Sequence, residues 1–197
     1  MREIMKMVVV LSLICGLSGL SLASIKQFTA PLIEEQVLTF VQGPSIKAVF
    51  TDFDNDPVKE RKQFDVPGSD KKVTVFPARK DGKLIGVAFE STGQGYGGDL
   101  GVMIGFTFEP GSVAGISMTT LKETPGIGAR VAKHGFTGQF RGHGLENLAL
   151  RSQGGDIDAV SGATISSTAA MFAVDQALNV YTALKDQFIT AFTTGAQ

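Results

Sequence analysis

The sequence has very little of the chemistry that binds metals. Its 197 residues include one cysteine, two histidines and no tryptophan. A single cysteine excludes an internal disulfide and an iron–sulfur cluster ligated by cysteines of one chain, and no Cys-x-x-Cys-His motif for covalent haem is present. We therefore expect no metal site. Redox or group-transfer chemistry would depend on an organic cofactor or on oxygen ligands.

Charge is also scarce. Charged residues make up 19% of the chain and the net charge is -1, so the basic footprint of a nucleic-acid-binding protein is absent. Hydrophobic residues make up 43%, which excludes disorder for most of the chain. Glycine is the exception to this scarcity, with 24 residues. Many of them lie between residues 93 and 162, which indicates tight turns and close approach of the backbone to another group.

Residues 7–25 contain no charged side chain, and this run is long enough to span a membrane. Arg2 and Lys6 precede it, so the positive-inside rule favours an orientation with the N-terminus inside and the remainder of the chain outside the cytoplasm. Two interpretations stay open, a retained anchor or a signal peptide cleaved near Ala23. Small residues on one helical face favour the anchor, because they let another membrane helix approach closely. They are Ser12, Gly16, Gly19 and Ala23.

Hydrophobic periodicity predicts an α+β fold. Alternation and turn residues indicate strands at residues 73–78, 84–90, 100–108 and 113–120. From residue 164 to 192 apolar residues recur every three or four positions, which is typical of a long helix packed on a sheet. We therefore predict a single N-terminal transmembrane helix, then an antiparallel sheet packed against a long C-terminal helix. The expected domains are an anchor (1–25), a stalk helix with a polar connecting segment (26–70) and a C-terminal domain (71–197).

Residues 93–98 match the dinucleotide-binding pattern Gly-x-Gly-x-x-Gly. That pattern needs a helix after the glycines, because the helix N-terminus binds the phosphates. The sequence that follows predicts another strand. We therefore reject a dinucleotide-binding fold.

Three segments remain whose residues suit a ligand: 95–99 (Gly-Tyr-Gly-Gly-Asp), 122–128 (Lys-Glu-Thr-Pro-Gly-Ile-Gly) and 158–164 (Asp-Ala-Val-Ser-Gly-Ala-Thr). The third opens the predicted C-terminal helix. Either Ser161 or Thr164 caps this helix, or the free N–H groups of its first turn bind a phosphate beside the Thr164 hydroxyl. The residues alone favour plain capping.

In order and spacing, these segments together resemble the FMN-binding domain family. That family includes the G subunit of the Rnf complex and the C subunit of the sodium-pumping NADH:quinone oxidoreductase. Residues 158–164 match its flavinylation pattern, Asp-x-x-Ser/Thr-Gly-Ala-Thr/Ser, and residues 123–128 are close to its Glu-Thr-Pro-Gly-Leu-Gly loop. The resemblance covers residues 70–192, and the compact chain looks more like the Rnf protein.

The resemblance implies that FMN is joined through its phosphate to the side-chain oxygen of Thr164, as a phosphoester. A separate Mg-dependent flavin transferase would take the FMN from FAD and recognise Asp158, Ser161, Gly162 and Ala163. Residues 71–197 would then be the FMN-binding domain. Its flavin pocket would be formed by Tyr96, Gly97, Gly98, Glu123, Thr124, Gly126 and Gly128. Leu121 stands where the family often has histidine, which leaves any polar role at that position in doubt.

The implied function is that of a single-pass electron-transfer subunit in the inner or cell membrane, with its flavin domain on the extracytoplasmic side. It would relay electrons between other membrane subunits of an Rnf-type ion-translocating ferredoxin:NAD oxidoreductase. It would have no independent catalysis, would not bind NAD and would not carry ions. Three alternatives stay open: the C subunit of a quinone reductase, a free-standing exported flavoprotein, and an exported binding module without flavin.

Overall fold

The computed structural model describes residues 1–193 of the chain. Two compact units are present, one of residues Met1–Phe40 and one that begins at Val41. The first unit is essentially the helix α1 (Arg2–Val37), which leads into a π-helical turn at Leu38–Gln42. Among the described residues, one helix is long and apolar enough to cross a membrane, and it begins at Arg2; its most apolar window has a mean hydropathy of 2.3. The predicted N-terminal segment therefore forms a helix of the expected kind.

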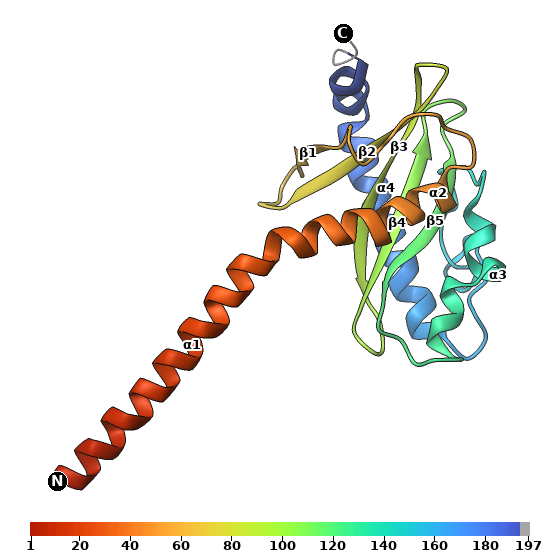
Figure 1. Ribbon diagram of the computed structural model, residues 1–197. Helices are drawn as coiled ribbons and strands as arrows, with labels where there is room; N and C mark the ends of the chain where they lie inside the picture. Colours follow the sequence, from red (N-terminus) through yellow and green to blue (C-terminus); the bar gives the residue numbers. More distant parts are fainter. Residues whose placement is uncertain (194–197) are drawn as a thin grey trace. The chain divides into compact units, whose positions relative to one another are not determined.

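The second unit contains a five-stranded antiparallel sheet in the order β1-β2-β3-β4-β5 (Figure 1). The four strands expected from the sequence correspond to β2 to β5. The sequence does not predict β1, because Phe64 is its one apolar residue and no alternation is visible. The strands are β1 (Lys62–Asp65), β2 (Lys72–Lys80), β3 (Lys83–Gln94), β4 (Asp99–Thr107) and β5 (Val113–Leu121).

Two turns set the register of the central strands. Asp81 and Gly82 both have positive φ, 50° and 73°, and they join β2 to β3 in the two-residue hairpin that such backbone angles favour. β3 and β4 pair without interruption as far as Gln94 and Asp99. Residues 95–98 therefore form the turn between these strands, so the first glycine-rich segment lies at the tip of a hairpin.

The long C-terminal helix α4 (Thr164–Thr193) lies along one face of the sheet (Figure 1). Its apolar stripe is buried against the sheet, as the periodicity predicts. The Tyr181 ring stacks on Phe106 with the ring centroids 4.4 Å apart, and the Tyr181 hydroxyl donates to the Thr107 carbonyl oxygen at 3.2 Å. Burial raises the pKa of this phenol. The observed architecture is the predicted α+β fold.

The opposite face of the sheet is covered by α2 (Gly43–Val49). Glycine makes this contact possible, because a Cβ at Gly105 would lie 2.2 Å from Val49 Cγ1. Three short helices pack against the edge strand β5 and contribute Val131, Phe136 and Phe140 to the core. They are η2 (Gly128–Ala132), α3 (His134–Thr137) and η3 (Gly138–Phe140).

Candidate functional site

The first two glycine-rich segments meet at the buried carboxylate of Glu123, which is 8% exposed. Its Oε1 atom accepts a hydrogen bond from the Tyr96 N–H at 2.8 Å. The two backbones also touch, since a Cβ at Gly97 would lie 2.0 Å from the Lys122 carbonyl oxygen. Because such a contact leaves no room for a side chain, glycine at position 97 is a packing requirement. The β3–β4 turn is thus joined to the loop that follows β5.

The start of α4 reaches the same point. A Cβ at Gly128 would lie 2.5 Å from Glu123 Oε2 and 2.8 Å from Ser166 Oγ. One turn further along α4, a Cβ at Gly93 would lie 2.0 Å from the Ala169 carbonyl oxygen. The helix therefore lies directly against the end of β3. The first two segments and the first turns of α4, which the third segment opens, therefore come together around Glu123.

The loop at residues 124–128 presents its apolar residue outward. The Thr124 carbonyl oxygen accepts hydrogen bonds from the N–H groups of Ile127 and Ala129, both at 3.2 Å. Gly126 has φ of +78°, a conformation that other residues rarely adopt. Thr124 is exposed, and so is the Ile127 side chain, at 52%. This loop therefore forms a small surface with both polar and apolar atoms.

Ser167, in the first turn of α4, connects the helix to the segment before it. Ser167 Oγ accepts the Val160 N–H at 3.0 Å and donates to the Ala163 carbonyl oxygen at 2.9 Å. Within residues 1–193, neither the Ser161 hydroxyl nor the Thr164 hydroxyl caps the helix, and both residues are exposed. The capping role that the residues alone favour is therefore not seen. The Thr164 hydroxyl is accessible at the first residue of the helix.

Exposed apolar side chains lie on the first two segments and on the N-terminal part of α4. From Val41 to the last described residue, four large hydrophobic side chains are exposed: Tyr96 (75%), Ile127 (52%), Ile165 (55%) and Phe172 (53%). Tyr96 and Ile127 belong to the first two segments, Ile165 directly follows the third, and Phe172 lies two turns further along the same face of α4. Of these four residues, the sequence analysis singled out Tyr96 alone. The signal that could have identified Ile127 and Ile165 was an apolar residue inside the second motif and another directly after the third.

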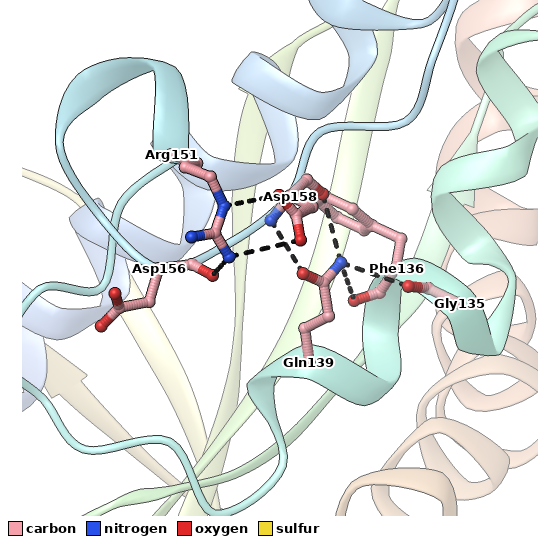
Figure 2. Close-up of polar contacts among 6 residues, drawn as sticks. All are labelled: Gly135, Phe136, Gln139, Arg151, Asp156 and Asp158. Carbon is pink, nitrogen blue, oxygen red and sulfur yellow. Dashed lines mark hydrogen bonds and ion pairs between the residues drawn. The ribbon is translucent and has the colours of Figure 1, made fainter.

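Asp158, at the other end of the third segment, is held by two side chains (Figure 2). Arg151 donates from Nε to Oδ1 at 2.7 Å and from Nη2 to Oδ2 at 3.4 Å. This hydrogen-bonded pair lowers the pKa of the Asp158 carboxyl group. Gln139 Oε1 accepts the Asp158 N–H at 2.8 Å, and its Nε2 donates to the Asp158 carbonyl oxygen at 3.1 Å. The sequence analysis missed Arg151 and Gln139, because both lie in three-residue helices, η4 (Arg151–Gln153) and η3, that carry no recognisable motif.

The remaining expected residues take these places. Gly98 has φ of +136°, and its carbonyl oxygen accepts the Gly95 N–H at 3.0 Å, which closes the β3–β4 turn. Gly162 is exposed with φ of +77°. Leu121 pairs with Leu100 at the end of β5 and packs against the core. An apolar residue therefore suits that position in this chain. Across the described residues, no group of three or more His, Cys, Asp or Glu side chains is arranged to hold a metal ion.

Comparison with known proteins agrees with this arrangement. The model of the FMN-binding domain matches residues 95–179, which include all three segments. The G subunit of the ion-translocating oxidoreductase complex of Salmonella typhimurium is 33% identical over 172 residues, which are 82% of each chain. The chain belongs to the FMN-binding domain family. A further relative is the G subunit of the proton-translocating ferredoxin:NAD(+) oxidoreductase complex of Clostridium ljungdahlii. It is 27% identical over 94% of this chain and 91% of its own length.

Two solved structures have the same fold as this family member. The C subunit of the Na(+)-translocating NADH-quinone reductase from Parabacteroides distasonis superposes with a TM-score of 0.50. It is 24% identical, with 65% of this chain and 66% of the other covered. NqrC from Shewanella oneidensis has a TM-score of 0.52 at 20% identity, with 68% and 74% covered. At these identities the likeness concerns the fold.

Proposed function

We propose that this chain is a membrane-anchored electron-transfer subunit that carries FMN as a phosphoester of Thr164, within an Rnf-type ion-translocating ferredoxin:NAD oxidoreductase. Membership of the FMN-binding domain family and the relatives that are G subunits of such complexes support the flavin and the type of complex. The observation that carries the attachment site is the Thr164 hydroxyl. It is exposed and does not cap α4, and it begins the helix that reaches Glu123.

The residues around Glu123 fit the two chemically distinct parts of FMN. The N–H groups in the first turn of α4 and the helix dipole favour a phosphate next to Thr164. The flat isoalloxazine ring needs apolar surface, which the exposed side chains of Tyr96, Ile127 and Ile165 supply. Thr124 is exposed and offers polar contacts to the edge of the ring or to the ribityl chain. The Glu123 carboxylate holds the segments together beneath this surface.

The attachment reaction needs an outside enzyme. The Thr164 oxygen would form a bond to the phosphorus of the FMN half of FAD, the pyrophosphate P–O bond would break, and AMP would leave. A free threonine hydroxyl is a poor nucleophile and needs a base to take its proton. The carboxylate of this segment, Asp158, is already paired with Arg151. The base would therefore belong to the Mg-dependent flavin transferase, which is the maturation partner we propose.

FMN supplies the redox chemistry by accepting and releasing electrons, while the protein sets its position and surroundings. In this chain Thr164 would prevent dissociation of the cofactor, and the apolar side chains would shield one side of the ring from water. Arg2 and Lys6 before the apolar run favour an orientation with the flavin domain on the extracytoplasmic side. The chain would relay electrons between neighbouring membrane proteins of the complex and would itself bind neither NAD nor the transported ion.

The attachment site is tested by intact-protein mass spectrometry of the full chain, produced together with a flavin transferase. We expect an adduct of FMN less one water, mapped to the peptide that contains Thr164. Thr164→Ala should abolish it, and the control Thr168→Ala should retain it, because Thr168 is an exposed hydroxyl one turn further along α4. A covalent flavin that persists in Thr164→Ala would refute the assignment. The same spectrum shows whether residues 1–23 are retained.

Assembly with other membrane subunits is tested on α1. Replacing both Gly16 and Gly19 with Leu should weaken copurification, because the small-residue face would be filled. A Cβ at either glycine meets nothing in this chain. The control replaces Ser18 and Ser21, on the other side of the helix, with Leu. Equal recovery of the partner proteins with both double variants would argue against this face as the contact.

A further inference from the structure

Asp158 is held by side chains that lie outside the flavinylation pattern (Figure 2). Both carboxylate oxygens accept hydrogen bonds from the Arg151 guanidinium. Gln139 binds the backbone of Asp158 on both sides, as acceptor for its N–H and as donor to its carbonyl oxygen. Asp158 thus has its charge matched and both its backbone groups paired before any partner arrives.

The residue that makes the backbone contacts is fixed to the core. Gln139 Nε2 also donates to the carbonyl oxygen of Gly135 at 3.2 Å, one turn earlier in the same helical segment. Phe136 and Phe140 flank Gln139 in sequence, are 2% and 0% exposed, and have ring centroids 5.3 Å apart. A side chain that is supported in this way holds its partner with little freedom. The start of the segment 158–164, which we call the acceptor segment, is therefore tied to the packed part of the domain.

The other end of the acceptor segment is also held. Ser167 bonds Val160 and Ala163, and Arg130 Nη1 donates to the Ser161 carbonyl oxygen at 3.0 Å. The residues between Asp158 and Thr164, of which Ala159, Ser161 and Gly162 are exposed, are therefore held at both ends. A segment ordered in advance avoids the entropy cost of ordering when it enters another protein's active site.

We propose that Gln139 and Arg151 are positioning residues for the attachment of FMN. They hold Asp158 so that the segment presents the Thr164 hydroxyl to the flavin transferase in one conformation. This inference rests on the proposed function. In this inference the Asp158 carboxylate serves to fix the segment by its pair with Arg151. The alternative is that a free Asp158 carboxylate contacts the transferase directly.

A charge exchange separates these two roles of Asp158. The assay measures the initial rate of FMN transfer to the full chain in detergent, with purified flavin transferase, FAD and Mg²⁺. Asp158→Arg and Arg151→Asp should each slow transfer by about tenfold or more, because misplacement of a reacting group has effects of this size. The double variant with both changes restores an opposite-charge pair and should recover most of the rate. The proposal is wrong if the double variant stays as slow as Asp158→Arg while Arg151→Ala accepts FMN at the wild-type rate. In that case the transferase contacts the Asp158 carboxylate directly.

Gln139 is tested with an apolar variant of similar size, which removes its hydrogen-bonding amide. Gln139→Met should slow transfer and increase hydrogen exchange in the peptide of residues 156–164, because the Asp158 N–H loses its acceptor. The control is Gln153→Met, an exposed glutamine on the neighbouring turn, which should change neither quantity. Both variants should keep the wild-type melting temperature within a few degrees. Unchanged hydrogen exchange in Gln139→Met would overturn the role of Gln139 without reference to the transferase.

The wild-type chain distinguishes failure of this inference from failure of the proposed function. If the wild-type chain accepts FMN and both Arg151→Ala and Gln139→Met accept it equally fast, the attachment site stands and the positioning role falls. If the wild-type chain accepts no FMN from a transferase that loads a control substrate, the proposed function fails. The positioning role then falls with it.

Discussion

At its C-terminal end α4 packs Phe188 and Phe192 against Phe64, with ring centroids 4.8 and 5.8 Å apart. Arg79 and Lys62 donate hydrogen bonds to carbonyl oxygens of its last turns. The two cations stabilise the helix end, because they satisfy carbonyl groups without helical partners and interact favourably with the dipole. The aromatic face of this end is buried, and two of its last carbonyl oxygens are paired with side chains.

At its N-terminal end the same helix begins with an exposed hydroxyl, at Thr164, and an exposed apolar side chain, at Ile165. Its contacts there are close backbone approaches at Gly93 and Gly128 instead of packed aromatic rings. The comparison shows that packed aromatic rings are concentrated at one end of α4, and that exposed groups suited to a ligand are concentrated at the other. Three predictions test this division, from the largest expected effect to the smallest.

The largest difference is expected between Phe188→Ala and Ile165→Ala. Phe188 is fully buried, so its truncation should reduce the free energy of unfolding by about 3–5 kcal/mol. Ile165 is 55% exposed, and an exposed substitution should stay within about 0.5 kcal/mol. Urea unfolding of the full chain in detergent measures both. Comparable losses for the two variants would mean that the N-terminal end of α4 contributes to stability as much as its C-terminal end.

A smaller effect is expected from Gly97→Ala. The new Cβ would lie 2.0 Å from the Lys122 carbonyl oxygen, so the β3–β4 turn would have to move away from Glu123. Forced shifts of this kind cost about 1–3 kcal/mol, and hydrogen exchange at Tyr96 should increase as its bond to Glu123 weakens. Gly135→Ala is the control, because a Cβ there meets nothing within 4 Å. Equal stability of the two variants would show that the segments are not packed as tightly as described.

The smallest loss is expected from Arg79→Met. Arg79 lies in β2 and bonds the C-terminal end of α4. The Arg79 side chain is 12% exposed, and its Nε donates to Glu60 Oε2 at 2.8 Å. Losing a charged hydrogen bond of this kind should reduce the free energy of unfolding by about 1–2 kcal/mol. Lys80→Met removes an exposed pair with Asp52 and should cost close to nothing. Thermal unfolding of the two variants measures both losses. If Lys80→Met loses as much stability as Arg79→Met, the role given to Arg79 is wrong.

Most of the fold could be predicted from local periodicity. β2 to β5 are long enough to show alternation, and α4 carries its apolar stripe over 30 residues. β1 has four residues, of which Phe64 is the one apolar side chain. Its place in the sheet depends on contacts between Phe64 and the aromatic residues of α4. Such contacts join residues far apart in the chain, and no local pattern encodes them.

For the candidate site, the sequence by itself determined which segments carry the family's motifs, because a motif is a pattern of neighbouring residues. It identified Thr164 in this way. The tertiary structure decided that these segments meet at Glu123, whose bond to Tyr96 spans 27 residues. It also decided that Ser167 bonds Val160 and Ala163 in front of the helix, and that Gln139 and Arg151 hold Asp158. The physical reason is that hydrogen bonds and close backbone contacts depend on distances set by packing of the whole domain, whereas motifs and periodicity depend on the order of residues along the chain.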